Sequence, residues 1–260
     1  MLWFSRPEFD RYARFKSHGS VREVMDWDEM CNVELPVPSY GEQLRIVESY
    51  KAITDRIAIK QKINDNLQQQ AFLFYKELIS NKVKNVVLSD IADITMGTSP
   101  EGDALNSQNK GIIFYQGKTD FGFRFPSVRQ YTTNPKRYAF PNDILMSVRA
   151  PVGPVNIALE KCAIGRGLAA IHPRDGKYSF LYYTMLELNF ELSKFNDEGT
   201  VFGSITKDDL HALAIVDVAD ELKSEFETAA SKIDALIFDN ETEIASLKET
   251  ISALLSRLTN

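Results

Sequence analysis

The stretch from Lys110 to Arg137 is rich in side chains that can bind nucleic acid. Its basic residues are interleaved with tyrosine, phenylalanine, glutamine, threonine and asparagine. Lysine and arginine neutralise phosphates, whereas arginine, glutamine and asparagine can also pair with base edges in the major groove. We therefore predict a DNA-contacting face whose cationic members are Lys118, Arg124, Arg129, Lys136 and Arg137. Composition alone would favour an ordinary solvated loop.

Further candidates lie beside glycines elsewhere in the chain. Arg166 stands between two glycines that would let the backbone approach a phosphate closely, although such glycines also suit a tight turn. Thr98 and Ser99 follow a glycine and could donate hydroxyl hydrogen bonds to phosphate, with loop capping as the alternative. Arg149 lies in an apolar strand before a Pro-Val-Gly turn, where a structural ion pair and a DNA contact are equally expected.

No catalytic pattern is complete in the sequence. Asn134-Pro135-Lys136-Arg137 begins like the Asn-Pro-Pro-aromatic loop of amino-methyltransferases, but it lacks the second proline and the aromatic residue that would stack on a flipped base. Glu221-Leu222-Lys223 matches half of a nuclease site without a strand-borne acid nearby. The three histidines are scattered, and no Walker loop occurs. We therefore predict a protein that is not an enzyme and that holds no metal or cofactor of its own.

Length, charge and composition limit the possible classes of protein. The 260 residues can form one or two domains with a proper core. The net charge of −6 argues against indiscriminate coating of DNA but leaves room for a local basic face. No apolar run approaches the ~18 residues of a membrane span, and the N-terminus lacks a signal-peptide pattern. The isolated Cys31 and Cys162 suit a reducing compartment, so we expect a cytoplasmic protein without a membrane partner.

Residues 15–79 and 195–259 are two versions of one segment, separated by 180 positions without insertion or deletion. The identical pairs include Phe15 and Phe195, Gly19 and Gly199, Val21 and Val201, Asp28 and Asp208, Ile53 and Ile233, Ile57 and Ile237, Leu67 and Leu247, and Leu78 and Leu258. A repeated element on either side of a different body indicates two equivalent elements that pair with each other.

Each copy ends in a heptad pattern typical of a long coiled-coil helix. Ser39 and Glu42 predict a capping box at the start of the first helix, and each helix would run about 60 Å. We predict an antiparallel pair with polar Lys60 and Asn240 at matching seam positions, where they would fix the register. The residues expected to pair the helices are Ile53, Ile57, Lys60, Leu67, Phe74, Ile233, Ile237, Asn240, Leu247 and Leu254. Two amphipathic helices in a bundle are the alternative.

Between the two helices the composition becomes that of a mostly-β domain with one helix. Strands are expected at 86–88, 91–94, 111–115, 143–148, 155–159 and 163–171, and the helix at 178–195. The predicted fold class is α+β, a mostly-β body flanked by two long helices in an antiparallel coiled coil. The expected parts are residues 1–38 for an incomplete tail, 39–80 for the first helix, 85–218 for the body and 219–260 for the second helix.

Several short motifs follow one another along the body and its flanks. They are Gly97-Thr98-Ser99-Pro100, Ser147 to Gly153, Ala163 to Leu168, Gly199 to Ile205 with its twin at Gly19-Ser20-Val21, and Leu35-Pro36-Val37-Pro38 with Glu42-Gln43. In order and spacing they resemble the target recognition domain and spacer helices of the specificity subunit of type I restriction-modification systems. The resemblance covers essentially the whole chain.

The resemblance implies two recognition domains, each followed by a spacer helix, on a bipartite target in double-stranded DNA. It also implies two partners, an adenine methyltransferase subunit and a restriction subunit with ATP-dependent translocation. S-adenosylmethionine, ATP and magnesium are expected only on those partner subunits. This sequence departs from the family plan because only one recognition domain is complete, and residues 1–38 match the tail of a first one.

With one complete recognition domain, we expect two copies to form a homodimer through the long helices and to read a palindromic bipartite target. A monomer with its helices paired within the chain is the competing geometry, because the seams favour neither. The alternative function is a coiled-coil assembly protein without DNA binding, or an inactive remnant, that modulates such a complex. The net charge of −6 is its best support.

Overall fold

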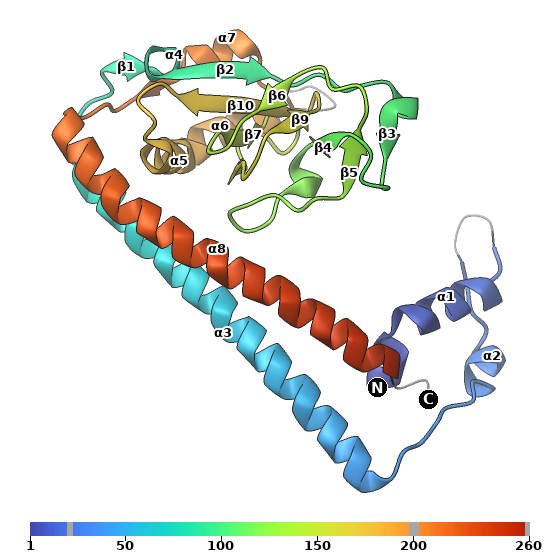
Figure 1. Ribbon diagram of the computed structural model, residues 1–260. Coiled ribbons are helices and arrows are strands. Elements are labelled where there is room, and N and C mark those ends of the chain that lie inside the picture. Colours follow the sequence, from blue (N-terminus) through green and yellow to red (C-terminus); the bar gives the residue numbers. More distant parts are fainter. Residues whose placement is uncertain (20–22, 198–202, 258–260) are drawn as a thin grey trace. The chain divides into compact units, whose positions relative to one another are not determined.

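The computed structural model describes residues 1–19, 23–197 and 203–257 (Figure 1). The chain divides into two compact units, which we call unit 1 (residues 1–65 and 239–260) and unit 2 (residues 66–238). The boundary between the units falls within both long helices, so each helix contributes to each unit. No helix in the described ranges is long and apolar enough to cross a membrane.

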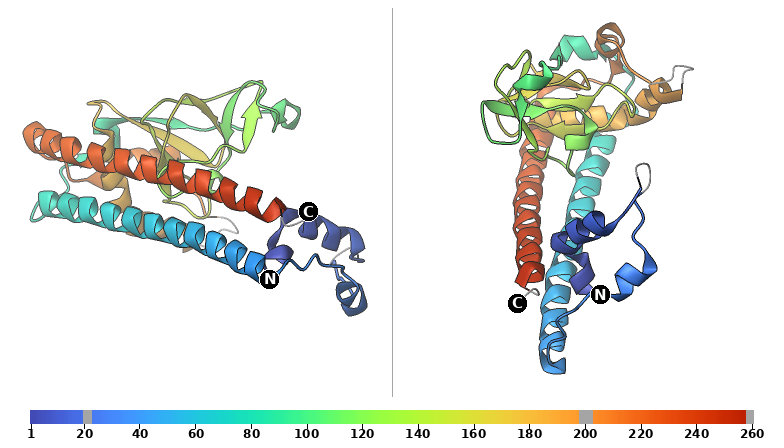
Figure 2. Two further views of the ribbon diagram at one scale, coloured as in Figure 1. Left: turned by 60° about the horizontal axis from the view of Figure 1, so that its bottom comes forward. Right: turned by 90° about the vertical axis from the view of Figure 1, so that its right-hand side faces the viewer.

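The two long helices are α3 (Tyr40–Ile79) and α8 (Asp220–Ser256), and they run side by side (Figures 1 and 2). Glu42 accepts hydrogen bonds from the backbone N–H and the hydroxyl of Ser39, so the predicted cap forms at the start of α3. The two helices begin at equivalent positions of the sequence repeat, 180 residues apart. Sequence periodicity therefore predicted both long helices.

The helices pair in antiparallel orientation, as predicted. In unit 1, Lys60 donates to Asn240 at 2.8 Å, and Asn240 donates to Asn64 at 2.7 Å. In unit 2, the rings of Phe74 and Phe226 lie 5.3 Å apart. Later residues of α3 contact earlier residues of α8, so the two helices run in opposite directions. Lys60 and Asn240 are equivalent positions of the repeat, so their contact marks the centre of the pairing.

Burial along the pairing face follows the expected positions except near the end of α3. Ile237 and Asn240 are buried, and the other predicted members are buried or partly buried apart from Phe74. Phe74 is 37% exposed, whereas its neighbour Tyr75 is 1% exposed. Tyr75 packs against Phe180 of the body, so the packing of the body on α3 shifts the buried stripe by one position.

Unit 2 contains two main sheets. The four-stranded sheet is antiparallel, with the order β2 (Ala92–Met96), β10 (Leu168–Pro173), β7 (Ile144–Ser147) and β8 (Val155–Ile157). The five-stranded sheet has the order β3 (Leu105–Asn106), β5 (Gln130–Thr132), β4 (Ile112–Tyr115), β9 (Cys162–Ile164) and β6 (Tyr138–Ala139), and only β4 and β9 are parallel. A short ladder joins β1 (Val86–Val87) to β11 (Ala214–Ile215).

The α+β class is confirmed, with two differences from the expected elements. The strand predicted at 163–171 is divided by the turn at Gly165–Gly167, and its halves β9 and β10 belong to different sheets. The helix predicted at 178–195 is divided at Leu188 into α5 (Tyr178–Glu187) and α6 (Asn189–Asp197). The described part of the body also holds α4 (Leu88–Ile91), α7 (Lys207–His211) and the short helices η2 (Gly102–Ala104) and η3 (Lys118–Asp120).

Helix α5 is the centre of the main core of unit 2. All of its residues from Ser179 to Met185 are buried, and they pack with β7, β8, β10 and the long helices. A helix buried on every side fits its high apolar and aromatic content. A smaller second core lies around Tyr115, Cys162 and Leu168. Together these cores hold the two sheets in fixed positions, and the strand ends form the candidate site.

Unit 1 begins with η1 (Leu2–Ser5), α1 (Pro7–Lys16) and α2 (Trp27–Cys31). Helix α2 coincides with α7 after a shift of 180 positions, so the repeat in sequence is also a repeat in structure. Neither α1 nor α2 contains a buried residue, and Phe15 and Trp27 are exposed. The glycine-containing motif at residues 199–205 and its twin at 19–21 lie largely outside the described residues.

Candidate nucleic-acid interface

Four loops of unit 2 meet where strands of the two sheets end. They follow β2 (residues 97–100), β4 (residues 116–119), β7 (residues 148–151) and β9 (residues 165–167). Backbone hydrogen bonds join them: Gly97 donates to Leu168, Thr98 to Ile164, and Gly165 to Tyr115. Because strands end here, these loops project side chains from a rigid scaffold, which is the usual place for binding residues.

Glycines allow these loops to approach each other closely. A Cβ atom at Gly97 would lie 2.2 Å from the carbonyl oxygen of Gly165, and one at Gly167 would lie 2.6 Å from that of Gln116. Any side chain at either position would force the loops apart. The Gly-x-Gly sequence around Arg166 is therefore a requirement of packing, and it places Arg166 at the meeting point.

Ser99 connects three of the four loops through its hydroxyl. It accepts a hydrogen bond from the side-chain amide of Gln116 at 3.2 Å and another from the backbone N–H of Arg166 at 3.2 Å. The hydroxyl of Ser99 thus positions these loops, which is the capping role considered from the sequence. Thr98 beside it is exposed.

A groove of about 480 Å³ runs between the loops. Its lining residues are Gln116, Gly117, Lys118, Thr119, Ser147, Arg149, Ala150, Pro151 and Gly167. Lys118 and Arg149 are exposed at the groove, and Arg166 is exposed next to its Gly167 wall. Within the part of the chain that the structure describes, none of these three cations forms an ion pair. The arrangement can bind an anion such as a phosphate by charge and by hydrogen bonds.

Arg129 and Asp120 form an ion pair at the edge of the same groove. The guanidinium of Arg129 donates to Asp120 at 2.8 Å, and it also reaches the hydroxyl of Thr119 at 3.4 Å. The carboxylate of Asp120 is almost fully buried and accepts backbone hydrogen bonds from Gln116 and Gly117. Asp120 therefore shapes the loop, and Arg129 neutralises it while remaining half exposed.

The structure places the remaining predicted cations in two different environments. Lys136 and Arg137 are exposed on the segment between β5 and β6. The carbonyl of Arg137 accepts from the N–H of Ile164, so Arg137 adjoins the end of β9, next to the groove loops. Lys118, Arg129, Arg137, Arg166, Thr98 and Ser99 thus belong to one region of the surface, with Lys136 beside it.

Arg124 is the exception, and its predicted place on a DNA-contacting face is wrong. Its side chain is 0% exposed and forms a buried ion pair with Asp234 of α8. It also donates to the hydroxyl of Tyr183 at 3.0 Å and lies over the ring of Tyr182 at 4.2 Å. Arginine is the cation best suited to such a buried site, because its guanidinium satisfies several planar partners at once.

Burial controls the acid–base properties around Arg124. It raises the pKa of Asp234, and the guanidinium of Arg124 together with the hydroxyl of Ser179 opposes this shift. Burial likewise raises the pKa of Tyr183 to about 12, so that its hydroxyl stays protonated and can accept from Arg124. This cluster fastens the body to the long helices of unit 2 and offers no surface for DNA.

The groove also contains Gln116 and Thr119, which were not among the predicted DNA contacts, and Arg149, for which a DNA contact and a structural ion pair were equally expected. Gln116 and Thr119 stand in the basic and polar stretch but carry no charge, so charge pattern gave them no weight. Arg149 seemed part of an apolar strand, but β7 ends at Ser147 and leaves Arg149 exposed. The signal in the sequence was its position just before a proline-containing turn at a strand end.

No group of three potential metal ligands occurs among the residues that the structure describes. His172 pairs with the buried Asp143 at 2.7 Å, and the other two histidines lie elsewhere. Burial raises the pKa of the Cys162 thiol to about 12, so this cysteine is an inert core residue.

A mixed sheet body with a cationic, hydroxyl-rich groove at its strand ends, carried on a long antiparallel helix pair, defines a recognition module. Residues 80–216 match the family model described as the type I restriction modification DNA specificity domain. The chain is 31% identical over 213 residues to a protein described as the putative type I restriction enzyme MjaX specificity subunit of Methanocaldococcus jannaschii. That alignment covers 72% of this chain and 49% of the relative, so the chain spans about half the length of the curated relative it matches.

Solved structures agree with this match. The HsdS subunit from Thermoanaerobacter tengcongensis is 28% identical with a TM-score of 0.54, covering 98% of this chain and 68% of that one. The type I restriction-modification system S subunit from M. genitalium, 12% identical with a TM-score of 0.63, shares the fold across 94% of this chain and 68% of its own. The chain belongs to the type I restriction modification DNA specificity family.

Proposed function

We propose that this chain is a DNA-recognition subunit of a type I restriction-modification complex. In this role it positions an adenine methyltransferase subunit and a restriction subunit on a bipartite target in double-stranded DNA. The observation that carries the proposal is the groove with Lys118, Arg149 and Arg166, which lies within the residues matched by the specificity-domain family. The half-length match to a specificity subunit supports it further.

The groove supplies binding without chemistry of its own. Lysine and arginine at its rim would neutralise phosphates, and the side-chain amide of Gln116 could hydrogen-bond to a base edge. Catalysis would belong to the partner subunits, together with S-adenosylmethionine, ATP and magnesium. The site would thus contribute sequence choice to a complex that works in the cytoplasm.

The long helices would hold the recognition body and the catalytic partner subunits at a fixed distance from each other. A helix of 40 residues, such as α3, extends about 60 Å. Its antiparallel pairing with α8 makes a stiff spacer, and the outer faces of both helices are available to partner subunits. A bipartite target needs a second recognition body beyond the one in unit 2. The homodimer expected from the sequence would supply it from a second copy, and light scattering of the chain without DNA tests that prediction.

DNA binding by the groove can be tested with three single substitutions. Lys118→Ala, Arg149→Ala and Arg166→Ala should each weaken binding of the chain, assembled with its methyltransferase subunit, to duplex DNA. Because each removes about one phosphate contact, each should also flatten the log–log salt dependence of the affinity by about one unit. The target for the assay is defined first by mapping methylated adenines in cells that express both subunits.

Arg174→Ala is the matched control for these variants. Arg174 follows the far end of β10 from the groove, is half exposed and pairs with Asp93 at 2.8 Å. It carries the same charge change and should leave both the affinity and the salt slope unchanged. Wild-type binding by all three groove variants would instead favour the coiled-coil assembly protein without DNA binding.

A further inference from the structure

Gln116 is a neutral polar residue that the surrounding loops hold in place at the wall of the groove. Its side-chain nitrogen donates to the hydroxyl of Ser99 at 3.2 Å, and that hydroxyl also accepts from the backbone N–H of Arg166. The backbone N–H of Gln116 donates to the buried carboxylate of Asp120 at 2.6 Å. Both the main chain and the side chain of Gln116 are therefore fixed by the protein itself.

Gly165 lies against Gln116 and limits its position further. A Cβ atom at Gly165 would lie 3.0 Å from the side-chain oxygen of Gln116 and 3.2 Å from its Cα atom. Only the absence of a side chain at position 165 lets the two loops lie this close. Gly165 is therefore part of what positions the amide of Gln116.

The amide of Gln116 keeps hydrogen-bonding capacity for a ligand. A glutamine amide has an acceptor oxygen and two N–H donors. Ser99 uses one of the N–H groups, and no residue in the described ranges donates to the side-chain oxygen. Gln116 is only partly buried, and this oxygen is open to solvent. The oxygen and the second N–H together offer one acceptor and one donor.

Adenine has the complementary pair of groups on its major-groove edge. Its N6 amino group donates and its N7 accepts, and a glutamine amide can bind both at once. Guanine presents two acceptors there, cytosine presents a donor, and thymine presents an acceptor and a methyl group. An amide that is held in place and offers one acceptor and one donor therefore favours adenine over the other three bases.

The cations around the groove are held differently from Gln116. Lys118, Arg149 and Arg166 are exposed. Long charged side chains at the surface suit phosphates, which are the same in every sequence. A neutral amide held by Ser99, Asp120 and Gly165 suits a base edge, because a rigid group left without its partner by the wrong base costs binding free energy.

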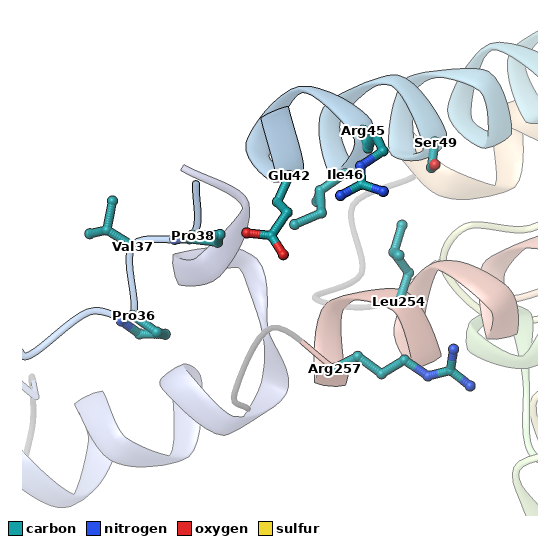
Figure 3. Close-up of a pocket in the computed structure, with 9 residues that line it drawn as sticks. All are labelled: Pro36, Val37, Pro38, Glu42, Arg45, Ile46, Ser49, Leu254 and Arg257. Carbon is teal, nitrogen blue, oxygen red and sulfur yellow. The ribbon is translucent and has the colours of Figure 1, made fainter. Parts of the chain in front are cut away.

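A larger hollow lies in unit 1, at the start of α3 and the end of α8 (Figure 3). Its volume is about 580 Å³, and its wall combines prolines and aliphatic side chains with Arg45 and Arg257. The carboxylate of Glu42 there already accepts from Ser39. None of the described residues that line this hollow carries a side-chain amide, so it lacks the acceptor and donor pair that the groove has.

We propose that Gln116 reads an adenine in the major groove and is a specificity-determining residue of the recognition body. Ser99 and Asp120 are positioning residues for it. The proposal rests on the proposed function, because it requires that the groove binds duplex DNA. It adds which side chain selects a base and which base is selected.

The test compares the wild-type chain with Gln116→Ala, Gln116→Glu and Gln108→Ala, each assembled with the methyltransferase subunit. Gln108 is exposed and precedes the start of β4, whereas Gln116 follows its end, so Gln108→Ala is the matched control for loss of an amide. The probe is a library of randomised duplex DNA, from which the bound fraction is sequenced. Duplexes that replace one base pair of the selected motif then give the preference at each position and the salt dependence of the affinity.

We expect Gln116→Ala to lose a preference for adenine of about 5- to 100-fold at one position of the motif and to keep the preferences at the others. Its salt slope should equal that of the wild type, because no phosphate contact is removed. Gln116→Glu should lose adenine at the same position and gain cytosine, whose N4 amino group donates to a carboxylate. Such an exchange of bases cannot arise from a misfolded chain. Gln108→Ala should select the wild-type motif.

Three results would overturn the proposal while the proposed function stands. They are selection of the wild-type motif by Gln116→Ala, a change at a G·C pair in place of an A·T pair, and the same change in Gln108→Ala. A wild-type chain that selects no motif would instead show that the proposed function fails, and the reading of adenine would fall with it. The lysine and arginine variants of the groove act on the salt slope and Gln116 acts on base preference, so the two failures are distinguished.

Discussion

At the scale of single residues, the same side-chain type has opposite roles in this protein. Arg149 and Arg166 are exposed at strand ends beside hydroxyl groups, whereas Arg124 is buried between two tyrosines and an aspartate. Neither the charge of an arginine nor its neighbours in the sequence show whether its side chain will be exposed or buried. What separates them is the position of each residue relative to the sheets, which decides whether a guanidinium meets solvent or a carboxylate of α8.

Arg124→Met should destabilise the chain by about 3–5 kcal/mol, because it leaves the buried Asp234 without its cation. The double variant Arg124→Met/Asp234→Leu should recover most of that loss, since a matched apolar pair replaces a matched ionic pair. Urea denaturation of the two single variants and the double variant forms the cycle that measures the coupling. Additive losses in the double variant would contradict the buried pair.

Gly97→Ala should destabilise the body by about 1–3 kcal/mol and weaken DNA binding together, because its Cβ would overlap the carbonyl of Gly165 and separate the loops. Gly102→Ala is the matched control, since a Cβ there meets nothing within 4 Å. Thermal unfolding and DNA affinity of the two variants check the prediction. Equal effects of the two substitutions would show that the close approach of the loops is unimportant.

At the scale of elements, the helix pair combines apolar contacts with one polar layer at its centre. Lys60, Asn64 and Asn240 form a hydrogen-bonded chain, and Lys60 and Arg56 also pair with Glu243. Asn64 and Asn240 are buried, so their amides depend on each other. A polar layer of this kind opposes any shift of one helix along the other, because a shift would bury these groups without partners.

Asn64→Leu alone should cost about 1–3 kcal/mol of stability, because the amide of the buried Asn240 loses its acceptor. Asn64→Leu/Asn240→Leu should be close to neutral or stabilising, since both partners become apolar while Lys60 keeps Glu243. Denaturant unfolding distinguishes the two variants. A double variant that is less stable than the single one would show that the layer stabilises the pair and does more than set its register.

At the scale of the whole molecule, the two units differ in how many of their side chains are buried. Unit 2 holds both cores and the fully buried α5, whereas α1 and α2 of unit 1 bury no residue. The sequence repeat nevertheless gives α2 and α7 the same length and position. Related local sequences thus form helices of equal length, while packing against β2 and α4 of the body buries Leu210 of α7.

Hydrogen exchange should reveal this difference directly. Backbone amides of α1 and α2 should open with free energies near zero to a few kcal/mol, because few buried contacts oppose local unfolding. Amides of β7, β10 and α5 should approach the global free energy of unfolding. Mass-spectrometric exchange of the full chain measures both sets. Comparable protection in the two sets would contradict the view that the helices α1 and α2 are held by few buried contacts.

Sequence alone determined the features that depend on short-range pattern. Heptad periodicity and the 180-residue offset predicted two long helices and their antiparallel pairing, because a heptad pattern places one apolar stripe along each helix. The α+β class and most strands followed from local alternation and turn residues. Only the tertiary structure showed that β9 and β10 belong to different sheets, that Ser99 joins Arg166, and that Arg124 reaches Asp234. Those contacts join residues 67 and 110 positions apart, and local pattern carries no information on pairing at such distances. The sequence therefore identified a cationic surface, and the packing of sheets and helices decided which cations belong to it.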